Sequence, residues 1–337
     1  MHFAPSDTQL AIRQEARRFL THRYPPGRVG ELADADGPRH DPAVWPQLRQ
    51  LGWLDRDAGL PELALVAEEC GRALLPAPWW VSAGAARRAF VAAGYQSDAP
   101  AVLARDGDCT AAEDGDGWRI EGVLRAVPDA AGVAEVVVTG STRDGSGLFR
   151  VAADDVAWTA VEGPDPLRAE ADGVLRGTAA RLLVAPGDAG RVGRTAALEA
   201  EVLRACEAVG VADRALEFGL DHARTREQFG KVIGGFQAVA HPLADGYAAV
   251  EFARSLAYRA ACVPDDEAAV AAAAHAATSA ALLTCETAIQ VCGGMGVTWE
   301  FPLHRWYRRA LWHAAYQASG PDVLDIVATA ALARGSA

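Results

Sequence analysis

The chain has 337 residues, of which 50% are hydrophobic and 23% charged, and its formal net charge at neutral pH is -12. A chain of this length fits two or three packed domains. The negative charge argues against a nucleic-acid-binding protein, because phosphate backbones require a concentrated basic surface. No apolar run is long enough to span a membrane, and charges occur throughout the first twenty residues, where a signal sequence would be apolar. We therefore expect a cytoplasmic protein without a membrane span.

The cysteines indicate neither a metal site nor disulfides. Their spacing matches neither CxxC nor a Cys/His ligand set, and most lie in apolar stretches, where a thiol packs as a small hydrophobic side chain. The six are Cys70, Cys109, Cys206, Cys262, Cys285 and Cys292.

The N-terminal part of the chain has the patterns of helices. Ser6 and Gln9 have the spacing of a capping box before a helix. Asp41 is placed to cap the helix that follows it, and residues 63–75 form another helical pattern. Two prolines then interrupt the pattern before an alanine-rich helix at 82–93.

The middle of the chain has a different pattern, typical of β-strands. Short runs rich in β-branched residues at 118–123, 136–139 and 147–151 are separated by Asp/Gly turns such as DGDG at 114–117. These runs predict a compact β-domain, and Pro186 begins a linker after it.

The C-terminal part, from Gly193 onward, contains at least four predicted helices. The later three are expected at 236–261, at 266–292 and from Pro302 onward, and the alanines of the third allow close packing in a bundle. The first has apolar residues three and four positions apart, a stripe typical of a packed helix, at Leu198, Val202, Ala205, Val209, Ala212, Leu216 and Leu220.

This order of elements predicts an α+β multidomain fold. We expect an N-terminal helical domain at 1–97, a middle antiparallel β-domain at 98–187 and a C-terminal four-helix bundle at 188–337.

Two C-terminal segments combine residues suited to binding a cofactor. In RTREQFGKVIGGFQAVAHPLAD (224–245), Arg226 can bind a phosphate, Gln228 can donate or accept a hydrogen bond, and Phe229 is aromatic. In QVCGGMGVTWEFP (290–302), the glycines leave the backbone open to a ligand. Each segment alone has a simpler explanation, the first as a helical hairpin and the second as the end of a helix.

Together, about 65 residues apart, these segments resemble the C-terminal domain of the acyl-CoA dehydrogenase family of flavoproteins. The resemblance extends from about 201 to 328, and more loosely over WPQLRQLGWL and EECGRALLPAP. It implies the acyl-CoA dehydrogenase fold, an FAD shared between the two subunits of a dimer or tetramer, and an acyl-CoA or acyl-carrier thioester as substrate. By this resemblance the residues that contact FAD are Arg226, Gln228, Phe229, Gln290, Gly293 and Gly294, with the first three at the diphosphate and adenosine end of a flavin in the neighbouring subunit.

The resemblance fails at the catalytic base. In many family members this base is the Glu of a Tyr-Glu-Gly-Thr element, and counting fifteen residues from Pro302 gives Gln317 in the sequence Tyr316, Gln317, Ala318, Ser319. A neutral amide cannot accept the α-proton as a carboxylate does.

Other family members place the base on the first helix of the bundle, at the position of Ala200. Glu199 and Glu201 flank that position. A shift of one residue turns a helical side chain by about 100 degrees, so neither glutamate replaces the base without local rewinding. We interpret both as a solvated helix start, where carboxylates favour the positive end of the helix dipole.

The middle domain is shorter than the family pattern. The segment AVLARDGDCTAAEDGDGW lacks the Thr/Ser-bearing stretch ending in Gly-Ser-Asp that contacts the isoalloxazine ring in family members, and the N-terminal Pro-Glu-x-x-Gly-Gly loop is shortened to DRDAGLPEL. These features are similar to the short, base-lacking subunits of heteromeric actinobacterial acyl-CoA dehydrogenases of steroid degradation.

Three functions are consistent with this sequence. The first is a noncatalytic or half-site subunit in FAD-dependent α,β-desaturation of an acyl thioester, beside a homologous subunit. The second is a self-sufficient acyl-CoA dehydrogenase with Glu199 or Glu201 as its base. The third is a scaffold recruited for dehydration, cyclisation or binding, in which Gln317, His313 and Tyr316 line a pocket. The simpler interpretation of His313 and Tyr316 is helix packing.

Overall fold

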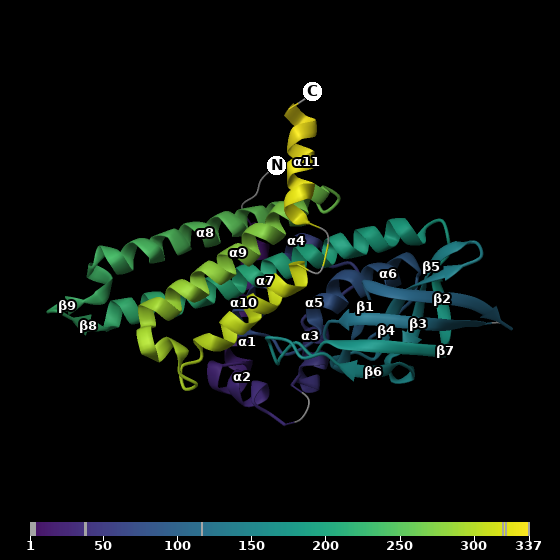
Figure 1. The fold of residues 1–337 in the computed structure, drawn as a ribbon, viewed down its shortest axis with the longest axis horizontal. Helices are drawn as coiled ribbons and strands as arrows, with labels where there is room; N and C mark the ends of the chain where they lie inside the picture. Colours follow the sequence, from purple (N-terminus) through teal and green to yellow (C-terminus); the bar gives the residue numbers. More distant parts are fainter. Residues whose placement is uncertain (1–4, 37–38, 116, 319, 321, 336–337) are drawn as a thin grey trace. The chain divides into compact units, whose positions relative to one another are not determined.

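The computed structural model describes residues 5–36, 39–115, 117–318, 320 and 322–335. The chain has N-terminal helices, a middle β region and C-terminal helices, as the sequence predicted (Figure 1). Its internal contacts define two compact units. We call Met1–Glu31, Gly59–Leu75 and Glu201–Ala337 the helical unit, and Leu32–Ala58 with Pro76–Ala200 the barrel unit. The three predicted domain boundaries stay a prediction.

The first helices confirm the N-terminal part of the prediction. The Ser6 hydroxyl accepts a hydrogen bond from the Gln9 N–H at 3.3 Å, and the Gln9 side-chain oxygen accepts one from the Ser6 N–H at 2.9 Å, so the capping box is present. Ion pairs tie the first helix to the fourth, with Arg13 2.7 Å from Glu68 and Arg17 2.8 Å from Glu69. The helices of this region are α1 (Asp7–Arg23), α2 (Pro26–Ala33) and α4 (Leu60–Ala73).

The C-terminal helices are α7 (Ala189–Thr225), which starts in the barrel unit, α8 (Gln237–Cys262), α9 (Glu267–Cys292), α10 (Leu303–Ala318) and α11 (Val323–Gly335). In the helical unit α8 and α10 pack along α9, whereas α11 contacts α9 and points away from the other helices (Figure 1). Asp266 caps α9 by accepting a hydrogen bond from the Ala269 N–H at 3.0 Å. The predicted stripe on α7 is buried in its middle part, at Val202, Ala205, Val209, Ala212 and Leu216.

Helix α9, continued by the turn to Val297, is long and apolar enough to cross a membrane by length and composition. Of its most apolar window, 61% is buried, and the helix packs against α8, α10 and α11. Burial of this kind is typical of a core helix, so composition is only weak evidence for a span.

Short helices form one part of the barrel unit. The Asp41 carboxylate accepts a hydrogen bond from the Ala43 N–H at 3.1 Å and caps the first of them, as predicted. The helix expected at 82–93 begins earlier, at Trp79, and contains a π-helical turn. These elements are η1 (Pro42–Val44), α3 (Trp45–Gln50), α5 (Trp79–Val81), the π-helical turn η2 (Ser82–Ala86) and α6 (Arg87–Ala92).

A seven-stranded sheet forms the other part of the barrel unit. Its order is β1-β4-β2-β3-β7-β5, β6 pairs with β7, and β4 also pairs with β5, which closes the sheet on itself. Most pairings are antiparallel, whereas β1 and β2 pair with β4 in parallel. The three predicted runs lie in β3, β4 and β5, and the other strands were not predicted. The strands are β1 (Ala101–Leu103), β2 (Asp106–Asp114), β3 (Gly117–Val127), β4 (Glu135–Thr142), β5 (Gly145–Ala152), β6 (Ala157–Ala160) and β7 (Ala171–Val184).

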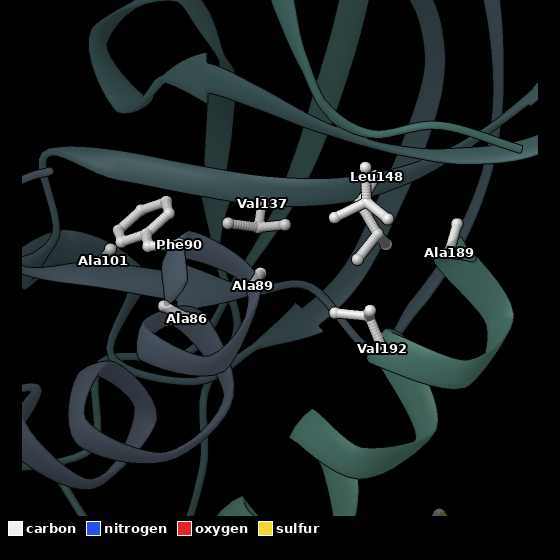
Figure 2. Close-up of a cluster of buried hydrophobic side chains, with 9 residues drawn as sticks. Ala86, Ala89, Phe90, Ala101, Val137, Leu148, Ala189 and Val192 are labelled. Carbon is white, nitrogen blue, oxygen red and sulfur yellow. The ribbon is translucent and has the colours of Figure 1, made fainter. Parts of the chain in front are cut away.

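An apolar core joins helices and strands within the barrel unit. Figure 2 shows side chains of η2 and α6 facing strand residues and the first turns of α7. This burial holds the start of α7 against the sheet. The cluster contains Ala86, Ala89, Phe90, Ala101, Val137, Leu148, Val184, Ala189 and Val192.

Candidate functional site

The connection between α7 and α8 is a small hairpin that displays an aromatic side chain. Strands β8 (Glu227–Gln228) and β9 (Lys231–Val232) flank Phe229 and Gly230, whose φ angles of +53° and +80° are those of a type I′ turn. The left-handed region costs a non-glycine residue roughly 1–2 kcal/mol. Phe229 is nevertheless 92% exposed, with its ring edge-on to Phe236 at 6.2 Å. Burial within this chain therefore does not account for an aromatic residue at this position.

Two polar residues predicted to bind the cofactor accompany Phe229. Arg226 and Gln228 are exposed, and the Gln228 side chain donates to the backbone oxygen of Glu227 at 2.7 Å. Arg226 forms no ion pair with any residue that the structure describes. Its guanidinium can therefore bind an external anion.

The second predicted segment follows α9 and has an open backbone. The helix ends at Gly293, whose φ is +60° and whose N–H donates to the Gln290 carbonyl. Gln290, Gly293 and Gly294 are exposed, and a Cβ added at either glycine would meet nothing within 4 Å. The segment both ends a helix and leaves room for a ligand to approach the main chain.

The predicted base position, Gln317, lies near the end of α10 beside a buried arginine of α7. The Gln317 Oε1 is 3.5 Å from Arg204 Nη2, and the Arg204 side chain is fully buried. Glu201 neutralises this cation through two contacts, at 2.9 Å to Nε and 2.5 Å to Nη2. Although burial opposes the charge, the Glu201 carboxylate raises the pKa of Arg204 above its usual value. The guanidinium is also 5.7 Å from the centre of the Tyr316 ring.

His313 joins Arg204 to a second buried ion pair. Arg204 Nη1 lies 3.3 Å from His313 Nδ1, and because arginine can only donate, Nδ1 is the acceptor and the ring proton is on Nε2. That nitrogen is 3.9 Å from Glu207, which pairs with Arg309 at 2.6 Å. His313 is therefore part of a buried polar network on α7 and α10. Ser319, the last residue of the Tyr316–Ser319 element, lies outside the described residues.

The interpretation of Glu199 and Glu201 as a solvated helix start is wrong. Helix α7 begins ten residues earlier, at Ala189, because its first turns are buried in the core of the barrel unit. Glu199 is 5% exposed and lies 3.5 Å from Arg87 and 3.4 Å from Arg88. Each glutamate is thus engaged by arginine, Glu199 by Arg87 and Arg88 and Glu201 by Arg204.

Position 200, the alternative base position, is closed by close packing. A Cβ added to Gly84 of η2 would lie 2.8 Å from the Ala200 Cα and 3.1 Å from its Cβ. A carboxylate side chain at position 200 would require these two helical segments to separate.

Sequence reasoning missed Arg204. The local signal was a cation inside the apolar run Val202, Leu203, Arg204, Ala205, Cys206. A charged residue inside an apolar run is predicted to be buried, and a buried charge needs partners.

Comparisons with known proteins agree with this architecture. Residues 194–328 match the model of the acyl-CoA dehydrogenase C-terminal domain. The chain is 31% identical to the acyl-CoA dehydrogenase IpdE2 of Mycobacterium tuberculosis over 334 residues, which cover 95% of this chain and 96% of that protein. It is similar to a chain of the ChsE4–ChsE5 complex from Mycobacterium tuberculosis, with 25% identity, full coverage of both chains and a TM-score of 0.85. A variant of the Tcur3481–Tcur3483 steroid ACAD has 25% identity, a TM-score of 0.83 and coverage of 98% of this chain and 99% of the other.

The chain therefore belongs to the acyl-CoA dehydrogenase family. Homologues in this family are FAD-dependent. The residues of the helical unit fit the adenosine diphosphate end of FAD, because Arg226 offers charge to the diphosphate, Phe229 offers an exposed ring, and Gly293 and Gly294 leave the backbone open.

Replacing Arg226 or Phe229 by alanine is expected to weaken FAD binding by about tenfold in each case, since a charge-assisted hydrogen bond or an aromatic contact is lost. Both side chains are exposed, so the midpoint of thermal unfolding of the flavin-free protein should not change. Titration of FAD into the assembled protein measures the affinity. Arg224→Ala is the matched control, because Arg224 is an exposed cation two residues away that faces Asp221 at 3.8 Å. Unchanged affinity in both variants would exclude the hairpin from the flavin site.

Proposed function

We propose that this chain is a half-site subunit of a heteromeric, FAD-dependent acyl-CoA dehydrogenase. In this function it completes the flavin site of a homologous partner subunit and does not itself remove the α-proton. The substrate class is an acyl thioester of CoA or of a carrier protein, in cytoplasmic lipid or steroid metabolism.

The main support for this proposal is the contrast between the exposed hairpin and the base position, which both lie in the helical unit. The hairpin at Arg226 and Phe229 is exposed and free to serve an external ligand, whereas the base position holds Gln317, an amide beside a permanently charged arginine. Compared with the family pattern, the residues expected to contact the flavin are thus present, whereas the carboxylate that accepts the proton is absent from position 317.

The barrel unit supports the same function. Strands β1 and β2 are joined by only Ala104 and Arg105. This connection has no room for the Thr/Ser-bearing stretch that the family pattern places before the later strands. The chain therefore has the residues expected at the adenosine end of FAD, but it lacks the stretch expected to contact the isoalloxazine ring.

The resemblance to ChsE4–ChsE5 and to Tcur3481–Tcur3483 supports a partner chain, because both names describe assemblies of two different subunits. When bound, FAD supplies the hydride acceptor of the desaturation. The residues of this chain would hold the adenosine diphosphate end, and a carboxylate of the partner subunit would remove the α-proton.

Purification of the chain alone and together with a homologous acyl-CoA dehydrogenase subunit tests this function. The lone chain is expected to hold well below one flavin per chain and to show no bleaching of visible absorbance when acyl-CoA is added. The complex is expected to be yellow and to bleach. Stoichiometric flavin and turnover by the lone chain would refute the half-site function.

A further inference from the structure

The turn that follows α9 in the helical unit displays apolar side chains to solvent. Within 293–300, all of which the structure describes, every residue except Gly296 is exposed. Three of these residues are large and apolar, namely Met295, Val297, which is 69% exposed, and Trp299, which is 59% exposed. We call residues 295–299 the apolar turn. Apolar side chains that gather in this way mark a surface that another molecule covers.

The apolar turn is held in one shape by contacts within the chain. A Cβ added to Gly296 would lie 2.8 Å from the Ile289 carbonyl oxygen, so the turn packs closely against the end of α9. The N–H and the hydroxyl of Thr298 both donate to the Met295 carbonyl oxygen, at 3.1 and 3.0 Å. A surface that is already ordered loses little conformational entropy when a partner binds to it.

The Trp299 ring is fixed by two neighbours and still faces solvent. It stacks on the His304 ring, with 4.8 Å between the ring centres and 25° between the planes. The guanidinium of the buried Arg305 lies 5.3 Å from the centre of the Trp299 ring, within the range of a cation–π interaction. Tryptophan is one of the residue types that contribute most to binding at protein interfaces, and methionine is enriched there.

The apolar turn adjoins the residues expected to bind the adenosine end of FAD, because Met295 directly follows Gly293 and Gly294. In the proposed function a partner subunit holds the flavin and this chain holds its adenosine end. The partner must then reach the edge of this surface, which places the side chains beside the two glycines at the subunit boundary. Ribose and diphosphate require polar groups, which the side chains of Met295 and Val297 do not supply.

We propose that the apolar turn is a docking surface for the homologous acyl-CoA dehydrogenase subunit that holds the flavin, with Trp299 as its main anchor. This inference rests on the proposed function, which supplies the partner. The matching surface of the partner is apolar and lies beside its flavin.

Trp299→Ala tests the docking surface in the complex of this chain with the homologous subunit. The variant is expected to raise the dissociation constant of the two subunits about thirtyfold, the effect of losing one dominant interface residue. Sedimentation velocity over a dilution series, with and without added FAD, measures that constant. FAD titration at subunit concentrations that keep the complex assembled should give the wild-type affinity, because the contact is with protein.

Three further variants guard against a change that merely disturbs the fold. Trp299→Phe keeps an aromatic ring over His304 and should retain most of the subunit affinity. Val297→Ser changes an exposed side chain and should weaken association by about threefold, as loss of a small apolar contact does. Leu10→Ala removes an apolar side chain that is 40% exposed on α1, and it should leave the subunit dissociation constant unchanged.

The outcomes separate this inference from the function on which it rests. If Trp299→Ala and Val297→Ser both leave the subunit dissociation constant unchanged, the inference is overturned and the half-site function stands. A fall in FAD affinity alone likewise overturns it, because Trp299 then contacts the cofactor. If the wild-type chain forms no complex with the homologous subunit, the half-site function itself fails.

Discussion

Gly210→Ala is expected to destabilise the protein by about 3 kcal/mol or more, the upper range for overpacking a close contact. Helices α4 and α7 cross within the helical unit at two glycines. A Cβ at Gly210 would lie 1.8 Å from the Glu68 carbonyl oxygen, and a Cβ at Gly71 would lie 1.9 Å from that of Glu207. The atoms in the way are backbone, so neither helix can yield by a rotamer change. Urea unfolding followed by circular dichroism measures the loss.

Gly193→Ala is the matched control for this prediction. Gly193 lies on the same helix, and a Cβ there would meet nothing within 4 Å. The substitution should stabilise the helix by about 0.5–1 kcal/mol, because alanine loses less backbone entropy than glycine. If Gly210→Ala has the stability of the wild type, the two helices do not cross as closely as the structure places them.

This crossing brings together two stretches of the sequence that resemble the family. The motif EECGRALLPAP contains Gly71, and the resembling stretch from 201 to 328 contains Gly210, so the two stretches meet in space. They also share charges, since Arg72 pairs with Asp213 and, at 2.9 Å, with Glu217. Gly71 and Gly210 therefore serve the packing of two stretches that resemble the family, whereas the exposed residues expected to contact FAD lie in the two C-terminal segments.

The helices could be predicted where local sequence signals mark their ends. Several strands could not be predicted from the sequence. The capping box at Ser6 and the cap at Asp266 are signals within four residues. By contrast, β2 has the polar sequence DGDCTAAED, and it is a strand because each of its residues pairs with β3 in register, from Asp106 opposite Arg125 to Asp114 opposite Gly117. Strand formation of this kind depends on neighbours and not on the propensity of the segment itself.

The residues of the candidate site also differ in how far they could be predicted from the sequence. Counting from Pro302 gave Gln317, and the hairpin residues could be named from their motif. The apolar run around Arg204 marks it as buried, but its contacts with His313 and Gln317 could not be named, because those residues are up to 113 positions distant in the sequence. Likewise, the ion pairs of Glu199 depend on arginines of another helix, so the sequence alone favoured a solvated position.

Arg204→Met is expected to lower the free energy of unfolding by about 3 kcal/mol, because removing one partner of a buried pair leaves the other charge uncompensated. Glu201 keeps only 23% of its side chain exposed, so water replaces the lost contacts incompletely. Methionine retains most of the volume, which separates the charge effect from a cavity. Chemical denaturation with an unchanged slope is the measurement.

The controls for this prediction are a double-mutant cycle and an exposed ion pair at the start of the same helix. Adding Glu201→Gln to Arg204→Met should recover at least about 1 kcal/mol, since the uncompensated carboxylate is then gone. Arg191 pairs with Asp188 at 2.9 Å with the same spacing of three residues, but its side chain is 72% exposed. Arg191→Met should therefore cost no more than about 0.5 kcal/mol. Equal losses for Arg204→Met and Arg191→Met would show that Arg204 is solvated, contrary to its full burial in the structure.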